Sequence, residues 1–368
     1  MNLRIPGPTP VPPEVLEVCA RPMINHRGPE FAVILDRVTK RVKEVFLTQN
    51  DVYILTTSGT GVMETAVVNT LSPGDRVLAI SGGAFGDRFA NIAKTYGADV
   101  SRLDVEWGKA ADPDDVRRAL AADAAIKAVL IVHNETSTGV TNPLAEIAKV
   151  VREFDKLLLV DAISSLSAVP VRTDEWGLDF VVSASQKGWM VPPALAMVSV
   201  SPRAWEAHAK AKMPRYYFDV TTAKDYLERG QTPWTPAVSV FYGLDFALGM
   251  MAKEGLENIF ARHRRIGQFT RDGVKSLGLE LFADERFASD TVTAVKVPEG
   301  VDGKALGKLC REEYDLVMAG GQAKLAGKIF RIGHLGFVSQ EDVKAALDVL
   351  AKALPRAGFA VPAGGSGG

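Results

Sequence analysis

Lys187 and Asp161 are the two charged residues of this sequence whose positions favour chemistry over solvation. Each follows an apolar run typical of a buried strand, Leu157–Val160 before Asp161 and Phe180–Ser183 before Lys187. A carboxylate at the end of a buried strand is costly unless a positive or hydrogen-bonding group faces it; capping of the following turn is the alternative. A lysine near such a carboxylate is a candidate for a desolvated amine that forms a Schiff base. We therefore predict that Lys187 is a nucleophile.

Three further features follow predicted strands. Thr57–Gly61 lies between a strand and a helix, where glycines allow close approach and the helix N-terminus offers N–H groups to a phosphate. Many such turns serve only for capping, and Glu64 stands where the dinucleotide fingerprint needs its third glycine. His133–Gly139 has more polar residues than a simple turn needs. Phe85 follows another strand, and core packing is its alternative role.

Together these residues fit one ligand, a pyridine ring with an aldehyde and a phosphate. Such a cofactor needs a carboxylate that keeps its ring nitrogen protonated, a lysine for the aldehyde, a flat side chain on the ring and a helix N-terminus for the phosphate. The candidates for these tasks are Asp161, Lys187, Phe85, Ser58, Gly59 and Thr60. The sequence therefore predicts pyridoxal 5'-phosphate, held as an aldimine on Lys187.

The elements around these residues alternate between strands and helices from about residue 51 to 201. Apolar runs separated by amphipathic patterns predict an α/β fold with a mostly parallel sheet covered on both faces, and ligands bind outside the carboxyl ends of such strands. The expected strands are 52–56, 76–81, 98–105, 128–133, 156–160, 180–183 and 195–200, and the helices are 61–71, 87–96, 113–121 and 143–154. Asn142 and Pro143 are expected to cap and open the last helix.

After about residue 236 the pattern predicts a smaller α+β domain. Its expected helices are 237–253, 256–277, 303–314 and 339–354, and its strands are 291–297 and 329–333. We predict an N-terminal arm over residues 1–20, a large cofactor-binding domain over 21–240, a small C-terminal domain over 241–357 and a disordered tail over 358–368. The arm contains Pro6–Pro13, which cannot be helical because proline removes donors and keeps the preceding residue extended.

The composition favours small-molecule chemistry. The 368 residues allow two domains, and 43 basic against 44 acidic residues provide no field for nucleic acid or an anionic membrane. Cys19 and Cys310 are the only cysteines, which argues against a disulfide framework or a cysteine metal site. The first residues lack the apolar run of a signal peptide, and no apolar stretch is long enough to span a bilayer. We expect a cytoplasmic protein without a metal.

With these motifs in this order, the chain resembles the class V aminotransferases of pyridoxal-phosphate fold type I, in particular the alanine–glyoxylate and serine–glyoxylate branch. The matching segments are Pro6–Thr9, Asn25–Arg27, Pro29–Phe31, Ser58–Thr60 with Glu64, Glu135–Gly139, Val160–Asp161, Ser185–Lys187, Thr235–Pro236, and Arg331–Gly333 with Gly336. The resemblance implies a sheet of the seven-stranded type and a homodimer with a shared active site.

The resemblance also implies roles for residues around the cofactor ring. Lys187 would form the aldimine and then move the proton between the substrate Cα and the cofactor. Asp161 would pair with the pyridinium nitrogen, and Phe85 would stack on the ring. Thr136 would hydrogen-bond the phenolic oxygen.

Further roles concern the phosphate and the substrate. Gly59, Thr60 and Gln186 would hold the phosphate, together with Thr235 from the other subunit. Arg331 would bind the substrate α-carboxylate as a bidentate pair. Some relatives have a tyrosine where this chain has Thr232, whose shorter hydroxyl leaves it outside the predicted site. His26 and Arg27 lie near the substrate in similar enzymes.

The leading interpretation is a ping-pong aminotransferase that moves an amino group from serine or alanine to glyoxylate or pyruvate. A 2-aminoethylphosphonate-type transaminase shares most of these motifs. Cysteine desulfuration would need a nucleophilic cysteine on a loop over the site, a setting that neither Cys19 nor Cys310 has. A non-catalytic subunit of a larger assembly is the fourth hypothesis, because the arm resembles that of relatives labelled as hydrogenase subunits; the intact lysine, aspartate and arginine argue against it.

Overall fold

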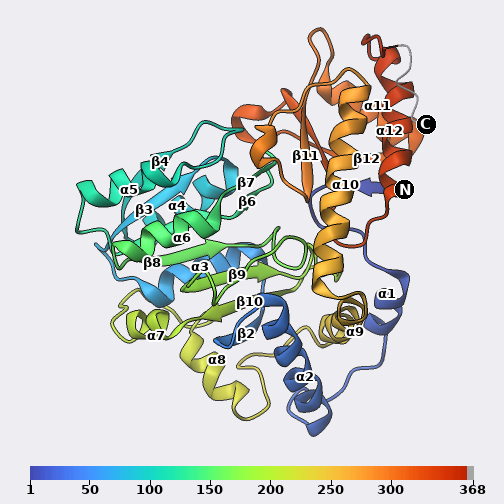
Figure 1. The fold of residues 1–368 in the computed structure, drawn as a ribbon. Coiled ribbons are helices and arrows are strands. Elements are labelled where there is room, and N and C mark those ends of the chain that lie inside the picture. Colours follow the sequence, from blue (N-terminus) through green and yellow to red (C-terminus); the bar gives the residue numbers. More distant parts are fainter. Residues whose placement is uncertain (363–368) are drawn as a thin grey trace.

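A seven-stranded sheet lies at the centre of the computed structural model, which describes residues 1–362 (Figure 1). Its strand order is β2-β10-β9-β8-β5-β3-β4. The parallel strands are β3 (Arg76–Ser81), β4 (Asp99–Asp104), β5 (Ala128–Val132), β8 (Leu157–Asp161) and β9 (Phe180–Ala184). Strand β10 (Leu195–Val200) runs antiparallel to β9 and to the edge strand β2 (Asp51–Thr56). The predicted mostly parallel sheet is confirmed.

Helices cover both faces of this sheet, because successive strand residues point to opposite sides. In β5, Leu130 belongs to one hydrophobic core and Ile131 to the other. The first core includes α3 (Gly59–Thr70), α4 (Ala84–Thr95), α7 (Pro202–His208) and α8 (Val220–Leu227). The second includes α1 (Pro13–Cys19), α2 (Pro29–Phe46), α5 (Pro113–Ala122), α6 (Leu144–Glu153) and α9 (Val238–Glu254).

A second sheet has four strands in the order β1-β12-β13-β11. These are β1 (Asn2–Arg4), β12 (Leu316–Gly320), β13 (Ile329–Gly333) and β11 (Val292–Lys296), packed with α10 (Leu256–Ser276), α11 (Gly303–Tyr314) and α12 (Gln340–Arg356). The first residues of the chain thus form an edge strand parallel to β12, and the amino terminus lies beside this sheet (Figure 1). A short hairpin of β6 (Asn134–Glu135) and β7 (Val140–Thr141) follows β5.

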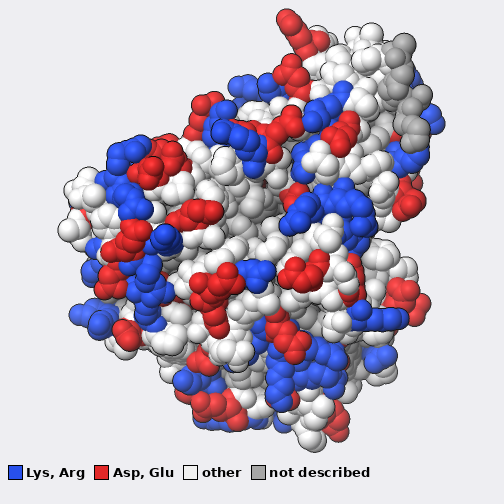
Figure 2. All heavy atoms as spheres, viewed as in Figure 1, with Lys and Arg blue, Asp and Glu red and all other residues white. Residues whose placement is uncertain are grey.

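The chain stays packed beyond α12. Phe359 and Val361 lie against the hydrophobic core of the second sheet, within the stretch that the sequence assigns to a tail; residues 363–368 of that stretch lie outside the described residues. Lys and Arg are interspersed with Asp and Glu over the face shown in Figure 2, as the net charge of −1 leads one to expect. Within residues 1–362, no helix is long and apolar enough to cross a membrane.

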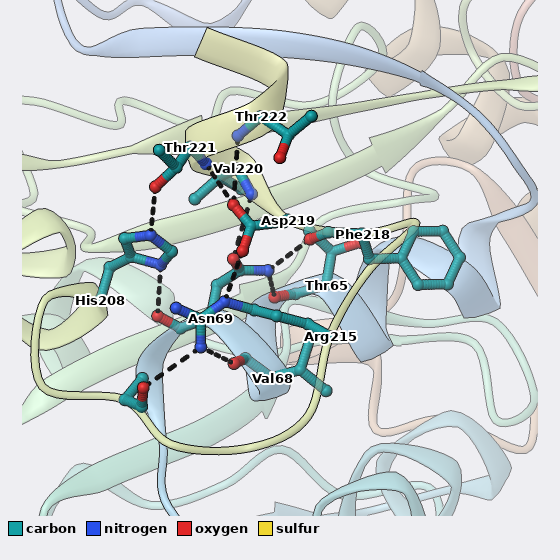
Figure 3. A network of polar contacts seen from close by, with 11 residues as sticks. Thr65, Val68, Asn69, His208, Arg215, Phe218, Asp219, Val220, Thr221 and Thr222 are labelled. Atoms are coloured by element: carbon teal, nitrogen blue, oxygen red, sulfur yellow. Dashed lines mark hydrogen bonds and ion pairs between the residues drawn. The ribbon is translucent and has the colours of Figure 1, made fainter. Parts of the chain in front are cut away.

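A buried polar network fixes α3 against the segment that precedes α8 (Figure 3). The Asn69 side chain donates to the carbonyl oxygens of Thr65 and Phe218, at 2.7 and 2.6 Å, and accepts from the Val220 amide at 3.1 Å. Phe218 in turn packs on the first turn of α3, because a Cβ added to Gly61 would lie 2.8 Å from its ring. The network therefore positions the turn that carries Ser58–Thr60.

We predict that Asn69→Ala lowers the free energy of unfolding by about 2 to 3 kcal/mol, because buried backbone groups of two segments lose their partners. Chemical denaturation of the cofactor-free protein measures this loss. Asn258→Ala is the matched control, since Asn258 is exposed and its side chain donates to the carbonyl of Glu254, only four residues earlier at the end of α9. Equal stability of the two variants would contradict the role given to Asn69.

Candidate active site

Asp161 and Lys187 meet at one cavity of about 300 Å³ outside the carboxyl ends of β8 and β9. Eight of the ten residues predicted for the site line this cavity: Ser58, Gly59, Thr60, Phe85, Thr136, Asp161, Gln186 and Lys187. Gly7, Pro8 and Arg88 also line it, and sequence reasoning gave none of these three a place in the site. Thr235 and Arg331 do not belong to the lining.

Asp161 is the last residue of β8 and is only 3% exposed. It alternates with Val160, so it shares the sheet face of Leu159, which α3 and α4 cover. One carboxylate oxygen accepts from the Ile163 amide at 2.9 Å, so Asp161 also caps the following turn. Burial raises its pKa to about 7, against the effect of that hydrogen bond and of the Lys187 charge. A cationic hydrogen-bond donor in the cavity would lower the cost of this charge.

Lys187 follows β9, and its side chain makes one hydrogen bond to the part of the chain that the structure describes. Its Nζ donates to the main-chain carbonyl of Pro6 at 2.7 Å. Burial lowers the pKa of the amine to about 8; the Asp161 charge opposes that change, and the Arg331 and Arg88 charges add to it. Within residues 1–362 Lys187 forms no ion pair with a carboxylate. A neutral amine is therefore accessible near pH 8, as a nucleophile requires.

Helix α4 begins beside the cavity with its first amides already satisfied. Ser137 Oγ accepts from Ala84 N at 2.9 Å, and Glu135 Oε2 accepts from the amides of Phe85 and Gly86 at 3.1 and 3.0 Å. The buried polar run around His133–Gly139 thus holds the helix start that carries Phe85. Burial raises the pKa of Glu135, and these hydrogen bonds oppose that rise.

At the same cavity, the first turn of helix α3 has no side-chain cap, in contrast to that of α4. Helix α3 begins at Gly59, and the Ser58 side chain makes no capping hydrogen bond. The side-chain oxygen of Gln186, which lines the same cavity, is buried without a hydrogen-bond partner. An uncapped helix N-terminus offers the amide donors that an oxygen-rich anion such as a phosphate would accept from, whereas the Gln186 oxygen is itself an acceptor and needs a donor. The start of α3 therefore fits the phosphate of the predicted cofactor.

Arg88 is a cation of the cavity that sequence reasoning missed. It lies one turn after Phe85 on α4, and its guanidinium carbon is 4.8 Å from the centre of the Phe85 ring. Its Nη1 donates to Thr60 Oγ1 at 3.3 Å. The spacing of three residues from Phe85 could have revealed it, since such residues share a helix face.

Arg331 and Thr235 lie outside the cavity lining for different reasons. Arg331 is buried in β13 and donates to the carbonyls of Gly320 and Thr136, so it touches the backbone of a lining residue. Burial lowers its pKa to about 10. Thr235 is exposed on the surface of the chain. Arg27 donates to the carbonyls of Thr232 and Pro233 and supports the segment that leads to Thr235.

Comparison with known proteins matches residues 2–345 to the family model "Aminotransferase class-V". The chain is 41% identical to the L-aspartate–glyoxylate aminotransferase of Paracoccus denitrificans, covering 90% of this chain and 85% of that protein. It is 37% identical to the serine–glyoxylate aminotransferase of Methylorubrum extorquens, covering 92% and 87%.

Two further similarities bear on fold and function. The crystal structure of the ureidoglycine–glyoxylate aminotransferase from Bacillus subtilis superposes with a TM-score of 0.95 at 32% identity, covering 99% of this chain and 95% of that one. A soluble hydrogenase small subunit of Synechococcus is 46% identical, covering 97% and 94%. The chain belongs to the class V aminotransferases and is a pyridoxal-phosphate-dependent transaminase.

We predict that Asp161→Asn has opposite effects on stability and on cofactor binding. A raised pKa means that Asp161 stabilises the fold below pH 4 and loses that contribution as pH rises through 7. The cofactor-free variant should therefore gain stability over the native protein between pH 4 and 7, measured by denaturation at several pH values. Its affinity for pyridoxal 5'-phosphate should fall about 10- to 100-fold, because a charge-assisted hydrogen bond is lost. Equal affinity would contradict the assignment.

Proposed function

We propose that this transaminase moves the amino group of a small amino acid, serine or alanine, to glyoxylate or pyruvate, with donor and acceptor occupying the same cavity in turn. The observation that carries the proposal is the joining of Asp161, Lys187 and the uncapped start of α3 around one cavity. Three of the relatives named above are glyoxylate aminotransferases by name, which supports glyoxylate as the acceptor.

Each residue would have a separate task in this reaction. The cofactor, when bound, supplies an aldehyde for the amino group and a ring that accepts electrons from the substrate Cα. Asp161 would hold a proton at the ring nitrogen, and Phe85 would stack on the ring. The amine of Lys187 would take the proton from the substrate Cα and pass it to the cofactor. The amides of Gly59 and Thr60 would hold the phosphate.

The cations around the cavity bear on the choice of substrate. We propose that Arg331 binds the α-carboxylate of donor and acceptor, since its Nη1 donates to the carbonyl of Thr136, a residue of the cavity lining. Arg88, unlike Arg331, lines the cavity, and no carboxylate within residues 1–362 forms an ion pair with it. Aspartate therefore belongs among the donors to be tested beside serine and alanine.

The donor is identified by half-reactions without an acceptor. We predict that serine or alanine converts the cofactor spectrum faster than glycine, aspartate or 2-aminoethylphosphonate in stopped-flow absorbance measurements. The phosphonate has no α-carboxylate for Arg331, which is the physical reason for its slower reaction. Lys187→Ala is the control, because it removes the proton-transferring amine and should abolish the fast phase. If 2-aminoethylphosphonate reacted fastest, the proposal would be wrong and the chain would be a 2-aminoethylphosphonate-type transaminase.

We propose that two copies of the chain share their sites, with Thr235 of one copy completing the phosphate site of the other. The support is the exposure of Thr235 next to an aromatic cluster of Tyr216, Tyr217 and Trp234. Tyr216 is 77% exposed and Tyr217 41% exposed. Aromatic side chains that gather on a surface are typical of protein interfaces.

Mixed dimers test this sharing. We predict that Thr235→Val binds the cofactor about tenfold more weakly, because one hydrogen bond to the phosphate is lost. In a mixture with Lys187→Ala subunits, the Thr235→Val subunits should regain native affinity, since the partner brings an intact Thr235. Titration of the mixture by absorbance measures the recovery. No recovery would mean that Thr235 does not act across subunits.

The remaining hypotheses have less support. Cys19 lies at the end of α1 and Cys310 is buried within α11, and neither lines the cavity, which disfavours desulfuration. The similar Synechococcus protein is named a hydrogenase subunit, which supports the hypothesis of a non-catalytic subunit. In the present chain, however, Lys187 and Asp161 line one cavity, which favours catalysis. A purely structural role would not explain why these two ionisable groups are buried side by side at a cavity, where burial disfavours the charged form of both.

A further inference from the structure

Residues 5–10 of the N-terminal arm lie along the cavity and contact the reactive Lys187. The carbonyl of Pro6 accepts from Lys187 Nζ at 2.7 Å, and Gly7 and Pro8 line the cavity. We propose that the main-chain carbonyl of Pro6 is a positioning group that orients the amine of Lys187 for proton transfer. This inference rests on the proposed function of Lys187 as the proton carrier.

The arm is fixed on both sides of Pro6. Before it, β1 pairs with β12, and Ile5 lies so close to β13 that a Cβ on Gly333 would be 2.3 Å from the Ile5 carbonyl oxygen. After it, the Thr9 amide donates to the Gln186 carbonyl at 3.0 Å. The Thr9 hydroxyl donates to the Lys187 carbonyl at 3.0 Å. The acceptor and the backbone of Lys187 are therefore held in one rigid frame.

Gly7 makes the close approach of the arm to Lys187 possible. A Cβ at Gly7 would lie 2.5 Å from Lys187 Nζ and 2.8 Å from its Cδ and Cε atoms. Its φ of 147° is also a conformation that side chains rarely adopt. A larger residue would thus push away the end of the lysine chain and leave the backbone contacts of Thr9 in place.

A carbonyl at this position has a defined effect on an amine. It accepts one N–H, which restricts rotation about the Cε–Nζ bond and fixes the direction of the nitrogen lone pair. When the nitrogen takes a proton, the same carbonyl stabilises the ammonium by a charge-assisted hydrogen bond. The other charges that act on this amine are those of Asp161, Arg331 and Arg88, from three different elements. The Pro6 carbonyl is the one group hydrogen-bonded to Nζ within residues 1–362.

The test measures the Lys187 amine in the cofactor-free protein. The pH dependence of its acylation by an amine-directed reagent, followed by peptide mass spectrometry, gives its pKa. In Gly7→Ala this pKa should fall by about one pH unit, because the hydrogen bond that favours the ammonium is lost. Gly300→Ala is the matched control, since Gly300 also has a positive φ and nothing within 4 Å of an added Cβ; its Lys187 pKa should stay native.

A second variant guards against loss of the fold in Gly7→Ala. Thr9→Val removes the hydroxyl that anchors the arm and adds no atom near Nζ, and it should lower the Lys187 pKa by a smaller amount. In the holoenzyme, Gly7→Ala should lower kcat about tenfold with little change in KM. A native Lys187 pKa in both variants would overturn the inference. Failure of transamination in the native protein would instead overturn the proposed function, because the acylation measurement requires neither cofactor nor turnover.

Discussion

The carboxylate of Asp161 and the amine of Lys187 are both removed from water at the ends of adjacent strands. Burial raises the pKa of the first to about 7 and lowers that of the second to about 8, so each group resists its charged form. The protein itself offers Asp161 one backbone amide and Lys187 one carbonyl. A ligand with a cationic ring N–H and a carbonyl carbon would satisfy both groups. The cost of burying them without that ligand is the constraint around which the site is built.

The two helix starts at the cavity show how selectively the fold leaves groups unsatisfied. At α4, Glu135 and Ser137 occupy the first amides and hold Phe85 in place. At α3 no side chain caps the first turn, while Asn69 and Phe218 secure the helix from the other side. One helix is therefore a support and the other a binding element. The N-terminal arm is a third element at the site, because β1 pairs with β12 of the second sheet and the following Pro6 accepts a hydrogen bond from Lys187.

Much of this arrangement could be predicted from the sequence because local signals sufficed. Local sequence patterns, mostly apolar runs, predict each strand of the large sheet to within two residues at either end, and residues after such runs meet at one sheet edge. The pattern predicts the start of α3 at residue 61, two residues later than the observed start at Gly59, because the glycines there are typical of a turn. Local patterns predict a strand or helix correctly where its formation depends mainly on its own residues.

Features that depend on distant partners escaped prediction. Strand β1 has three residues and exists only because β12, more than three hundred residues later, pairs with it. The sequence predicts that Asn142 caps α6, but the helix begins at Leu144, and the Asn142 side chain accepts from Ala111 N and donates to Val132 O instead. Arg88 is indicated in the sequence only by its spacing of three residues from Phe85, and its contact with Thr60 depends on a separate helix, α3.

The most direct test of the account is to locate the lysine that carries the cofactor. The native protein, incubated with pyridoxal 5'-phosphate and reduced with borohydride, is digested and its peptides are identified by mass spectrometry. We predict that the reduced cofactor is found on the peptide that contains Lys187, and that Asp161→Asn lowers the amount trapped at limiting cofactor. Attachment at another lysine, or none at all, would contradict it.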